Sequence, residues 1–217
     1  MKKVLKWTAI VVGVVYSLIV FVAPAVLLHL LCDKHVAYHR VYKAEEAVTE
    51  YVKATYADIP VIVMGLSMGG SIAIRSIGKN DDIDALITLS AYSSVQDFMG
   101  GQFGRFITPV LAYPVKLTTA LYAGLKFGVN GFNATPLESI GNLHGRPALM
   151  MHSRKDSQVP FICFEKLTQK ATTVSNDIRT YIVDGDEHFI TGSFGMPEED
   201  KAYNSVLLEF VKSVVDK

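Results

Sequence analysis

The feature that most constrains the fold is a short apolar run that leads directly into small residues around a serine. Residues 61–64 read Val-Ile-Val-Met, residues 65–69 read Gly-Leu-Ser-Met-Gly, and residues 71–77 continue as a helical pattern up to Gly78. An uncharged, β-branched run of this kind is typical of a strand buried on both faces of a parallel sheet. The glycines let the chain turn sharply into the helix. The sequence therefore predicts a strand–turn–helix unit with Ser67 at its tip.

The same alternation of strand and helix continues toward the C-terminus. The pattern predicts strands over residues 85–90, 148–152 and 180–183, and helices over residues 161–171 and 197–215. Upstream, residues 33–57 have helical spacing, and Pro60 should end that helix near Tyr56. Strands that alternate with helices indicate an α/β fold with a mainly parallel sheet flanked by helices.

Two polar residues follow successive predicted strands at the point where each ends. Asp156 comes after the strand at 148–152, and His188 comes after the strand at 180–183. In a parallel sheet the carboxyl ends of the strands share one edge, which is also where Ser67 stands. A serine hydroxyl is a weak nucleophile that needs a base, and the order serine, acid, histidine suits this role. We therefore expect Ser67 as nucleophile, His188 as base and Asp156 as the residue that orients the imidazole.

Each of these residues also has an ordinary structural explanation. Ser67 is a possible helix N-cap, Asp156 a surface turn residue and His188 a plain loop histidine. His152 is a second candidate base, although its place at a strand end beside the acid favours a structural role. The other acids near His188 lie too close to it in sequence to occupy the loop after the preceding strand.

The N-terminal part of the chain contains a long apolar segment. Residues 7–28 include no Lys, Arg, Asp or Glu, and Lys2, Lys3 and Lys6 precede them. As a helix this run extends roughly 33 Å, enough to cross a bilayer core. It predicts a single-pass anchor in the cell membrane, with a cytoplasmic N-terminus and the rest of the chain outside. A signal peptide cleaved near residues 23–25 and a buried core helix are the alternatives.

The domain organisation follows from these segments. The anchor would occupy residues 1–32 and a single α/β domain residues 33–217. Between about residues 96 and 141 the alternation breaks, and the segment is rich in glycine and aromatic residues. It is interpreted either as a helical lid over the strand ends or as ordinary packed helices.

Composition narrows the range of partners and cofactors. The 21 Lys and Arg balance the 21 Asp and Glu, and no basic block with interleaved aromatics is present, so nucleic-acid binding has little support. The two cysteines, Cys32 and Cys163, provide neither a disulfide framework nor metal-ligand spacing. Acyl-enzyme chemistry needs no cofactor, and we expect none.

Together these motifs resemble the α/β-hydrolase superfamily. The likeness is greatest to bacterial membrane-anchored or secreted serine hydrolases related to acylaminoacyl-peptidase and Bem46-like proteins. Residues 61–70 resemble the elbow that carries the nucleophile, residues 145–160 the acid-bearing loop, and residues 185–188 (Gly-Asp-Glu-His) the histidine loop. The resemblance covers about residue 43 to the C-terminus, and implies hydrolysis through Ser67, Asp156 and His188.

The sequence departs from this family upstream of the elbow. Only residues 33–60 separate the apolar segment from the elbow strand, and one helix fills most of them. Complete members have several strands and an oxyanion loop of His-Gly type before the elbow. Neither feature has a counterpart in this part of the sequence. The sheet should therefore begin at or next to the elbow strand, with the Met68 N–H as the one evident oxyanion donor.

Three functional hypotheses follow. The first is a membrane-anchored serine hydrolase that cleaves an ester, thioester or amide of a small, fairly apolar substrate. The second is a shortened, weakly active or inactive hydrolase fold that acts as a non-enzymatic interaction protein. The third is a membrane-interaction module with an incidental motif, which three motifs in the expected order disfavour.

Overall fold

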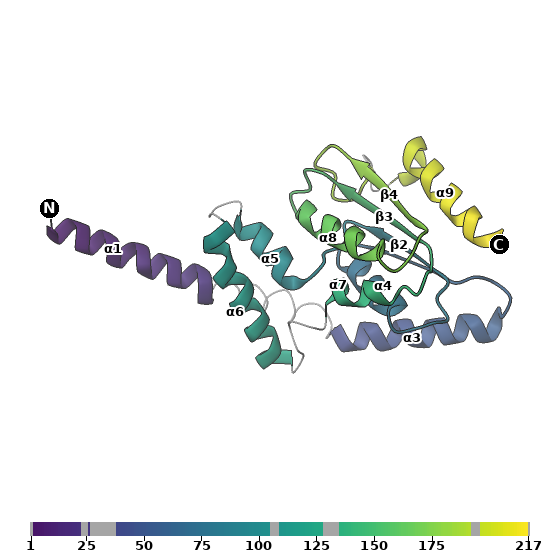
Figure 1. The fold of residues 1–217 in the computed structure, drawn as a ribbon, viewed down its shortest axis with the longest axis horizontal. Helices are drawn as coiled ribbons and strands as arrows, with labels where there is room; N and C mark the ends of the chain where they lie inside the picture. Colours follow the sequence, from purple (N-terminus) through teal and green to yellow (C-terminus); the bar gives the residue numbers. More distant parts are fainter. Residues whose placement is uncertain are drawn as a thin grey trace.

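A four-stranded parallel sheet forms the centre of the molecule (Figure 1). The structure is a computed structural model that describes residues 2–22, 26, 38–104, 109–127, 135–191 and 196–216. The strands are β1 (Ile62–Leu66), β2 (Ala85–Leu89), β3 (Ala148–Ser153) and β4 (Ile178–Val183), and they lie side by side in chain order. All three strand pairings are parallel, which confirms the predicted α/β architecture.

The helices that surround this sheet follow the predicted alternation closely. They are α1 (Lys2–Ser17) with the π-helical turn η1 (Leu18–Val22), α3 (Tyr38–Thr55), α4 (Met68–Ile77), α5 (Val95–Gly104), α6 (Pro109–Phe127), α7 (Pro136–Ser139) with the 3-10 turn η2 (Ile140–Asn142), α8 (Phe161–Ala171), the 3-10 turn η3 (Pro197–Glu199) and α9 (Lys201–Val215). The last helix begins at Lys201 rather than residue 197. Asp200 caps it by accepting hydrogen bonds from the N–H groups of Ala202 and Tyr203.

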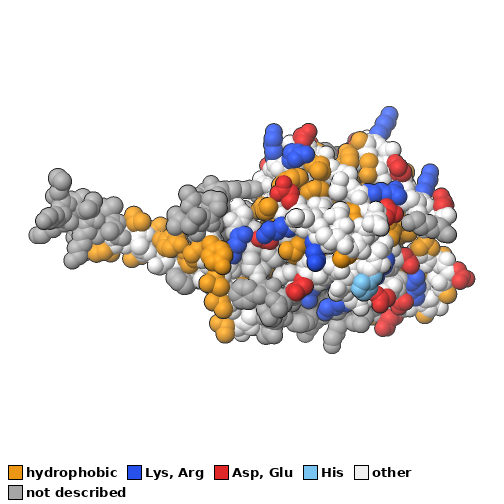
Figure 2. Space-filling view, in the orientation of Figure 1, with side chains coloured by type: hydrophobic (Ala, Val, Ile, Leu, Met, Phe, Trp, Pro, Cys, Tyr) orange, Lys and Arg blue, Asp and Glu red, His pale blue; other side chains and the backbone are white. Residues whose placement is uncertain are grey.

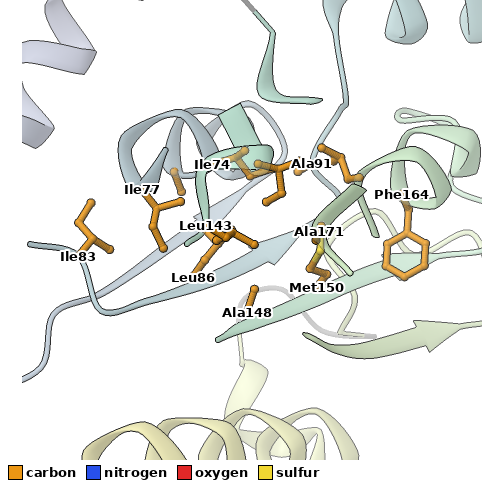
Figure 3. Packing of buried hydrophobic residues seen from close by; sticks show 13 residues of the cluster. Ile74, Ile77, Ile83, Leu86, Ala91, Leu143, Ala148, Met150, Phe164 and Ala171 are labelled. Atoms are coloured by element: carbon orange, nitrogen blue, oxygen red, sulfur yellow. The ribbon is translucent and has the colours of Figure 1, made fainter. Parts of the chain in front are cut away.

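Side chains that alternate along the strands build a core on each face of the sheet. Leu86, Ala148 and Met150 face a cluster that also holds residues of α4 and α8, such as Ile74, Ile77, Phe164 and Leu167 (Figure 3). Their strand neighbours Ala85, Ile87, Leu149 and Met151 face a second cluster with Tyr203, Phe210 and Val214 of α9. The sheet is therefore a middle layer between α4 and α8 on one face and α9 on the other.

The two central strands are buried along their whole length, whereas the outer strands are not. Within the described residues β1 pairs with β2 alone, so the elbow strand forms one edge of the sheet. The expectation that the sheet begins at the elbow strand is confirmed for this part of the chain. Met64, in the middle of β1, is exposed on that edge.

The segment between β2 and β3, where the sequence predicts a helical insertion, contains α5, α6 and α7. Residues 105–108 and 128–134 of that segment lie outside the described residues. The side-chain amide of Gln102 in α5 donates to the carbonyl of Ser157, in the loop that follows β3. The insertion therefore contacts the edge of the sheet at which the strands end.

A buried carboxylate joins the insertion to the body of the protein. Asp97 of α5 forms ion pairs with Lys116 of α6 (3.0 Å) and Lys166 of α8 (2.6 Å), and it accepts a hydrogen bond from the Ser93 hydroxyl. Burial works to raise the pKa of Asp97, but hydrogen bonds from the two lysines and Ser93 outweigh it and lower the pKa from 3.8 to about 2. These contacts hold three helices against one another.

The N-terminal helix extends away from the body of the molecule (Figure 1). Across the described residues, no helix combines the length and the apolar character needed to cross a membrane. Residues 23–25 and 27–28 of the expected membrane segment lie outside the described part of the chain. The transmembrane span stays a prediction.

Candidate active site

Ser67 occupies the sharp turn between β1 and α4. Its backbone has φ 54° and ψ −118°, a left-handed conformation that costs a non-glycine residue about 1–3 kcal/mol. Its N–H donates to the carbonyl of Leu89 (2.7 Å), so the turn is fixed to the end of β2. The Ser67 side chain makes no capping hydrogen bond to the helix. Ser67 thus stands at the N-cap position of α4 without capping the helix through its hydroxyl.

Two glycines allow α4 to pass very close to β1. A Cβ atom at Gly65 would lie 2.2 Å from the carbonyl oxygen of Gly69. A Cβ atom at Gly70 would lie 2.9 Å from the carbonyl oxygen of Gly65 and 3.1 Å from the Cβ of Ala91. Only glycine fits at Gly65 without movement of the backbone, because the clash would be with main-chain atoms. The motif is thus required for the close packing of strand and helix.

Asp156 and His188, predicted from separate loops, form a buried pair. His188 Nδ1 lies 2.8 Å from Asp156 Oδ2, and both side chains are almost fully buried. The other carboxylate oxygen accepts hydrogen bonds from the N–H groups of Gln158 (2.7 Å) and Val159 (2.8 Å). Burial works to raise the pKa of Asp156, but the hydrogen bonds from His188 and these two amides prevail and lower it. The carboxylate is therefore ionised, and it favours the tautomer of His188 with a proton on Nδ1 and a basic Nε2.

Hydroxyl groups that sequence reasoning did not identify hold the two loops in place. Ser90, directly after β2, donates to the carbonyl of His188 (2.6 Å). Ser153, at the end of β3, donates to the carbonyl of Gly185 and accepts from the N–H of Glu187 (3.1 Å). Small hydroxyl residues at the ends of two buried strands were the available signal. Their bonds fix the histidine loop to the strands on which the other site residues stand.

The acidic neighbours of His188 have partners of their own. Asp184 forms an ion pair with Arg154 (3.1 Å), and Asp186 accepts a hydrogen bond from the N–H of Ser157 (2.6 Å). Both contacts connect the histidine loop to the acid loop. Asp156 is therefore the carboxylate that contacts the His188 ring.

Ser67 and the Asp156–His188 pair lie at the same edge of the sheet. Ser67 is bonded to Leu89, and the next residue, Ser90, is bonded to His188, so one β2 terminus connects the two parts of the site. The described residues show no hydrogen bond between the Ser67 hydroxyl and the His188 ring. Catalytic hydrogen bonds are often long without substrate and shorten in the reacting complex.

His152 is a fully buried histidine behind the acid loop. Its Nε2 lies 3.1 Å from the carbonyl of Val159, and its ring packs against Phe161 and Phe164. Burial lowers the pKa of His152, so the ring is neutral and its Nε2–H donates to that carbonyl. His152 is 3.7 Å from Asp156, too far for a hydrogen bond. The geometry fits the structural role expected for this residue.

The N-terminal end of α4 supplies the candidate oxyanion donor. The helix begins at Met68, next to Ser67, where the first N–H groups have no intrahelical partner. The preceding helix, α3, leads into β1 at the opposite, amino-terminal edge of the sheet, so its connection to β1 does not reach this point. In the part of the chain that the structure describes, no three His, Cys, Asp or Glu side chains are grouped to hold a metal ion.

Comparisons with known proteins agree with the fold. No protein-family model matches the sequence, and no curated protein matches it. Among solved structures the chain is similar to an esterase of Pyrococcus furiosus, with a TM-score of 0.56 and 17% sequence identity. The match covers 79% of this chain and 60% of the esterase.

Two further solved structures have comparable similarity. One is the esterase domain of a Rhodothermus marinus protein, with a TM-score of 0.56, 16% identity, and coverage of 80% of this chain and 69% of the domain. The other is a Staphylococcus aureus protein of unknown function, with a TM-score of 0.52, 16% identity, and coverage of 78% of this chain and 70% of that one. The chain thus spans less than two thirds of the first esterase and shares the α/β fold of these structures.

Proposed function

We propose that this chain is a serine hydrolase that cleaves an ester, thioester or amide through an acyl-enzyme intermediate. The observation that carries the proposal is the buried Asp156–His188 pair at the sheet edge where the Ser67 turn stands. In the proposed mechanism His188 Nε2 accepts the Ser67 proton as the hydroxyl attacks the carbonyl carbon. His188 then donates that proton to the leaving group, while Asp156 stabilises the imidazolium.

The Met68 N–H would stabilise the oxyanion that forms in the tetrahedral intermediate. Water would attack the acyl-enzyme in a second step, with His188 again as base, and release the acid. The esterases with the same fold support an ester substrate. The proposed location is a cell membrane, to which residues 7–28 hold the chain with the catalytic part outside.

A fluorophosphonate probe tests this proposal directly, because it forms a covalent bond with an activated serine. We expect the wild-type chain to be labelled and the Ser67→Ala variant to be unlabelled. Ser205 lies exposed on α9, so the Ser205→Ala variant is a matched control that should label like wild type. Absence of labelling in folded wild-type protein would contradict the proposal.

The second candidate is a shortened hydrolase fold with a non-enzymatic interaction role. It is favoured by the coverage of only 60% of the Pyrococcus furiosus esterase and by the position of β1 at the sheet edge in the described residues. A folded, monodisperse chain that neither labels nor hydrolyses a panel of p-nitrophenyl esters would support this alternative.

A further inference from the structure

Helix α1 and the turn η1 expose a broad surface of apolar side chains. Ile10, Val11, Val12, Val14, Val15, Leu18 and Val22 are all exposed. Successive residues of a helix point about 100° apart, so these positions form one broad apolar surface that covers about 200° of the helix, and Val20 on the remaining side is buried. An exposed apolar surface this broad suits an apolar environment such as lipid.

Helix α6 exposes a second apolar set. Tyr113, Leu117, Leu121 and Leu125 recur every four residues and are between 43% and 88% exposed. The opposite side of the helix is buried in the protein through Val115, Thr119 and Ala120. This stripe is large and continuous, unlike the scattered single apolar residues that are normal on a protein surface.

The two apolar sets adjoin each other. The hydroxyl of Thr118, next to Leu117 in α6, donates to the carbonyl of Val20 in η1 (2.6 Å), and Val20 is buried. Figure 2 shows hydrophobic side chains gathered along α1 and down the adjoining outer side of α6. We call the exposed residues of α1, η1 and the α6 stripe the α1–α6 surface.

We propose that the whole α1–α6 surface contacts a lipid bilayer, so that α6 lies in the membrane interface beside the N-terminal helix. The charge distribution supports lipid as the partner. Lys2, Lys3 and Lys6 are the only Lys, Arg, Asp or Glu residues before Asp33, and basic groups at the start of an apolar helix suit anionic headgroups. The inference rests on the proposed anchor and extends it to a helix of the insertion.

This contact has a consequence for the orientation of the catalytic part. Helix α6 packs against α5 through the Lys116–Asp97 ion pair, and Gln102 of α5 contacts the acid loop at Ser157. The insertion therefore connects the α1–α6 surface to the edge of the sheet that carries Ser67. A bilayer against α6 would place this edge on the membrane side of the protein.

Tryptophan quenching by brominated lipids tests the inference in the full chain. Trp7 is the only tryptophan, so Trp7→Phe provides a background without tryptophan. Three variants each add one probe: Leu121→Trp in the α6 stripe, Val14→Trp in α1, and Leu208→Trp on α9. Leu208 is 55% exposed and serves as the matched control. The variants are reconstituted in vesicles of phosphatidylcholine and phosphatidylglycerol, with and without bromine on the acyl chains.

We expect the Leu121→Trp and Val14→Trp emission to be roughly halved by brominated lipid and the Leu208→Trp emission to be unchanged, because an interfacial helix places its apolar face among the first acyl carbons. Quenching of Val14→Trp without quenching of Leu121→Trp would overturn the inference and leave the anchor in place. Quenching of neither would overturn both.

Self-association gives a different result. Leu121→Trp emission that shifts to the blue with protein concentration but does not respond to bromine would assign the α6 stripe to a second copy of the chain. Equal quenching of Leu121→Trp and Leu208→Trp would also overturn the inference, because the surface would then be no different from the rest of the protein.

Discussion

At the scale of single residues, the two glycines on either side of Leu66-Ser67-Met68 have opposite steric constraints. An alanine at Gly65 would clash with the backbone of Gly69, whereas a Cβ at Gly69 would meet no atom within 4 Å. The Gly-x-Ser-x-Gly pattern therefore contains one glycine that the backbone geometry requires and one that it does not. This difference is measurable.

We expect Gly65→Ala to lower the free energy of unfolding by about 3 kcal/mol, because strand and helix must move apart. Gly69→Ala, at the start of α4, should leave stability unchanged or raise it by a few tenths of a kcal/mol, because alanine is the better helix former. Urea unfolding of both variants measures the difference. Equal stabilities would contradict the close approach of β1 and α4.

His152 stabilises the acid loop without contacting the His188 imidazole. Its Nε2–H holds the carbonyl of Val159, and the N–H of Val159 in turn donates to Asp156. His152→Leu would leave that carbonyl buried without a donor, at a cost of about 1–3 kcal/mol in stability. We also expect slower fluorophosphonate labelling, because Asp156 would be held less firmly.

The matched variant is His152→Gln, whose side-chain amide can donate from a similar distance. His152→Gln should have a melting temperature and a labelling rate close to those of the wild type. If His152→Leu labels as fast as wild type, the acid loop does not depend on this hydrogen bond.

At the scale of elements, Asp97 is the main polar connection between α5, α6 and α8. Its pKa lies below its ordinary value, so its stabilising contribution is present above pH 3.8 and disappears as the pH falls through about 2. A shift of this size corresponds to about 2 kcal/mol at neutral pH. The insertion should therefore loosen in this acidic range.

We expect Asp97→Asn to reduce stability at pH 7 by about 2 kcal/mol and to remove the part of the acid-unfolding transition between pH 4 and pH 2. Thermal unfolding measured over this pH range shows whether the stabilisation by Asp97 is lost as the pH falls. As a control, Asp184→Asn removes an exposed ion pair with Arg154 and should change stability by less than about 1 kcal/mol. An Asp97→Asn curve parallel to wild type at all pH values would contradict the ion cluster.

Sequence periodicity was sufficient to predict the sheet and most helices, because buried apolar runs and helical spacing are local signals. Helix α8 was predicted with its observed bounds, and β3 to within one residue. The prediction for β4 began two residues late, because Arg179 hides the start of the strand. Arg179 is tolerated there since β4 is an outer strand and Asp177 pairs with it (3.2 Å).

The candidate site was predictable only in part. Asp156 and His188 could be inferred because both follow successive strands, and the structure brings them together. The contacts of Ser90 and Ser153 could not be inferred, since the sequence shows only a small hydroxyl residue at the end of each strand and its partner depends on strand register. The Asp97 cluster escaped for a similar reason: its lysines are distant in sequence and meet only after three helices pack.

At the scale of the whole molecule, the position of β1 at the sheet edge would limit the oxyanion hole of the proposed enzyme. Met68 is the one donor evident in the described residues, and loss of a donor typically slows turnover about 10²–10³-fold. We therefore expect readily detected fluorophosphonate labelling of Ser67 but slow hydrolysis of p-nitrophenyl acetate, with Ser67→Ala as the background. Turnover near an ordinary enzyme rate of about 10 s⁻¹ would show that another group completes the hole.

The order of the strands also has a consequence for how the protein is made. Because β1, β2, β3 and β4 lie in chain order, each new strand leaving the ribosome can dock on the one before it. Ser67 is then in place early, Asp156 follows with β3, and His188 arrives only with β4. In the proposed mechanism, a nascent chain would carry the nucleophile long before the base, and cellular esters would not acylate it until its last strand has joined the sheet.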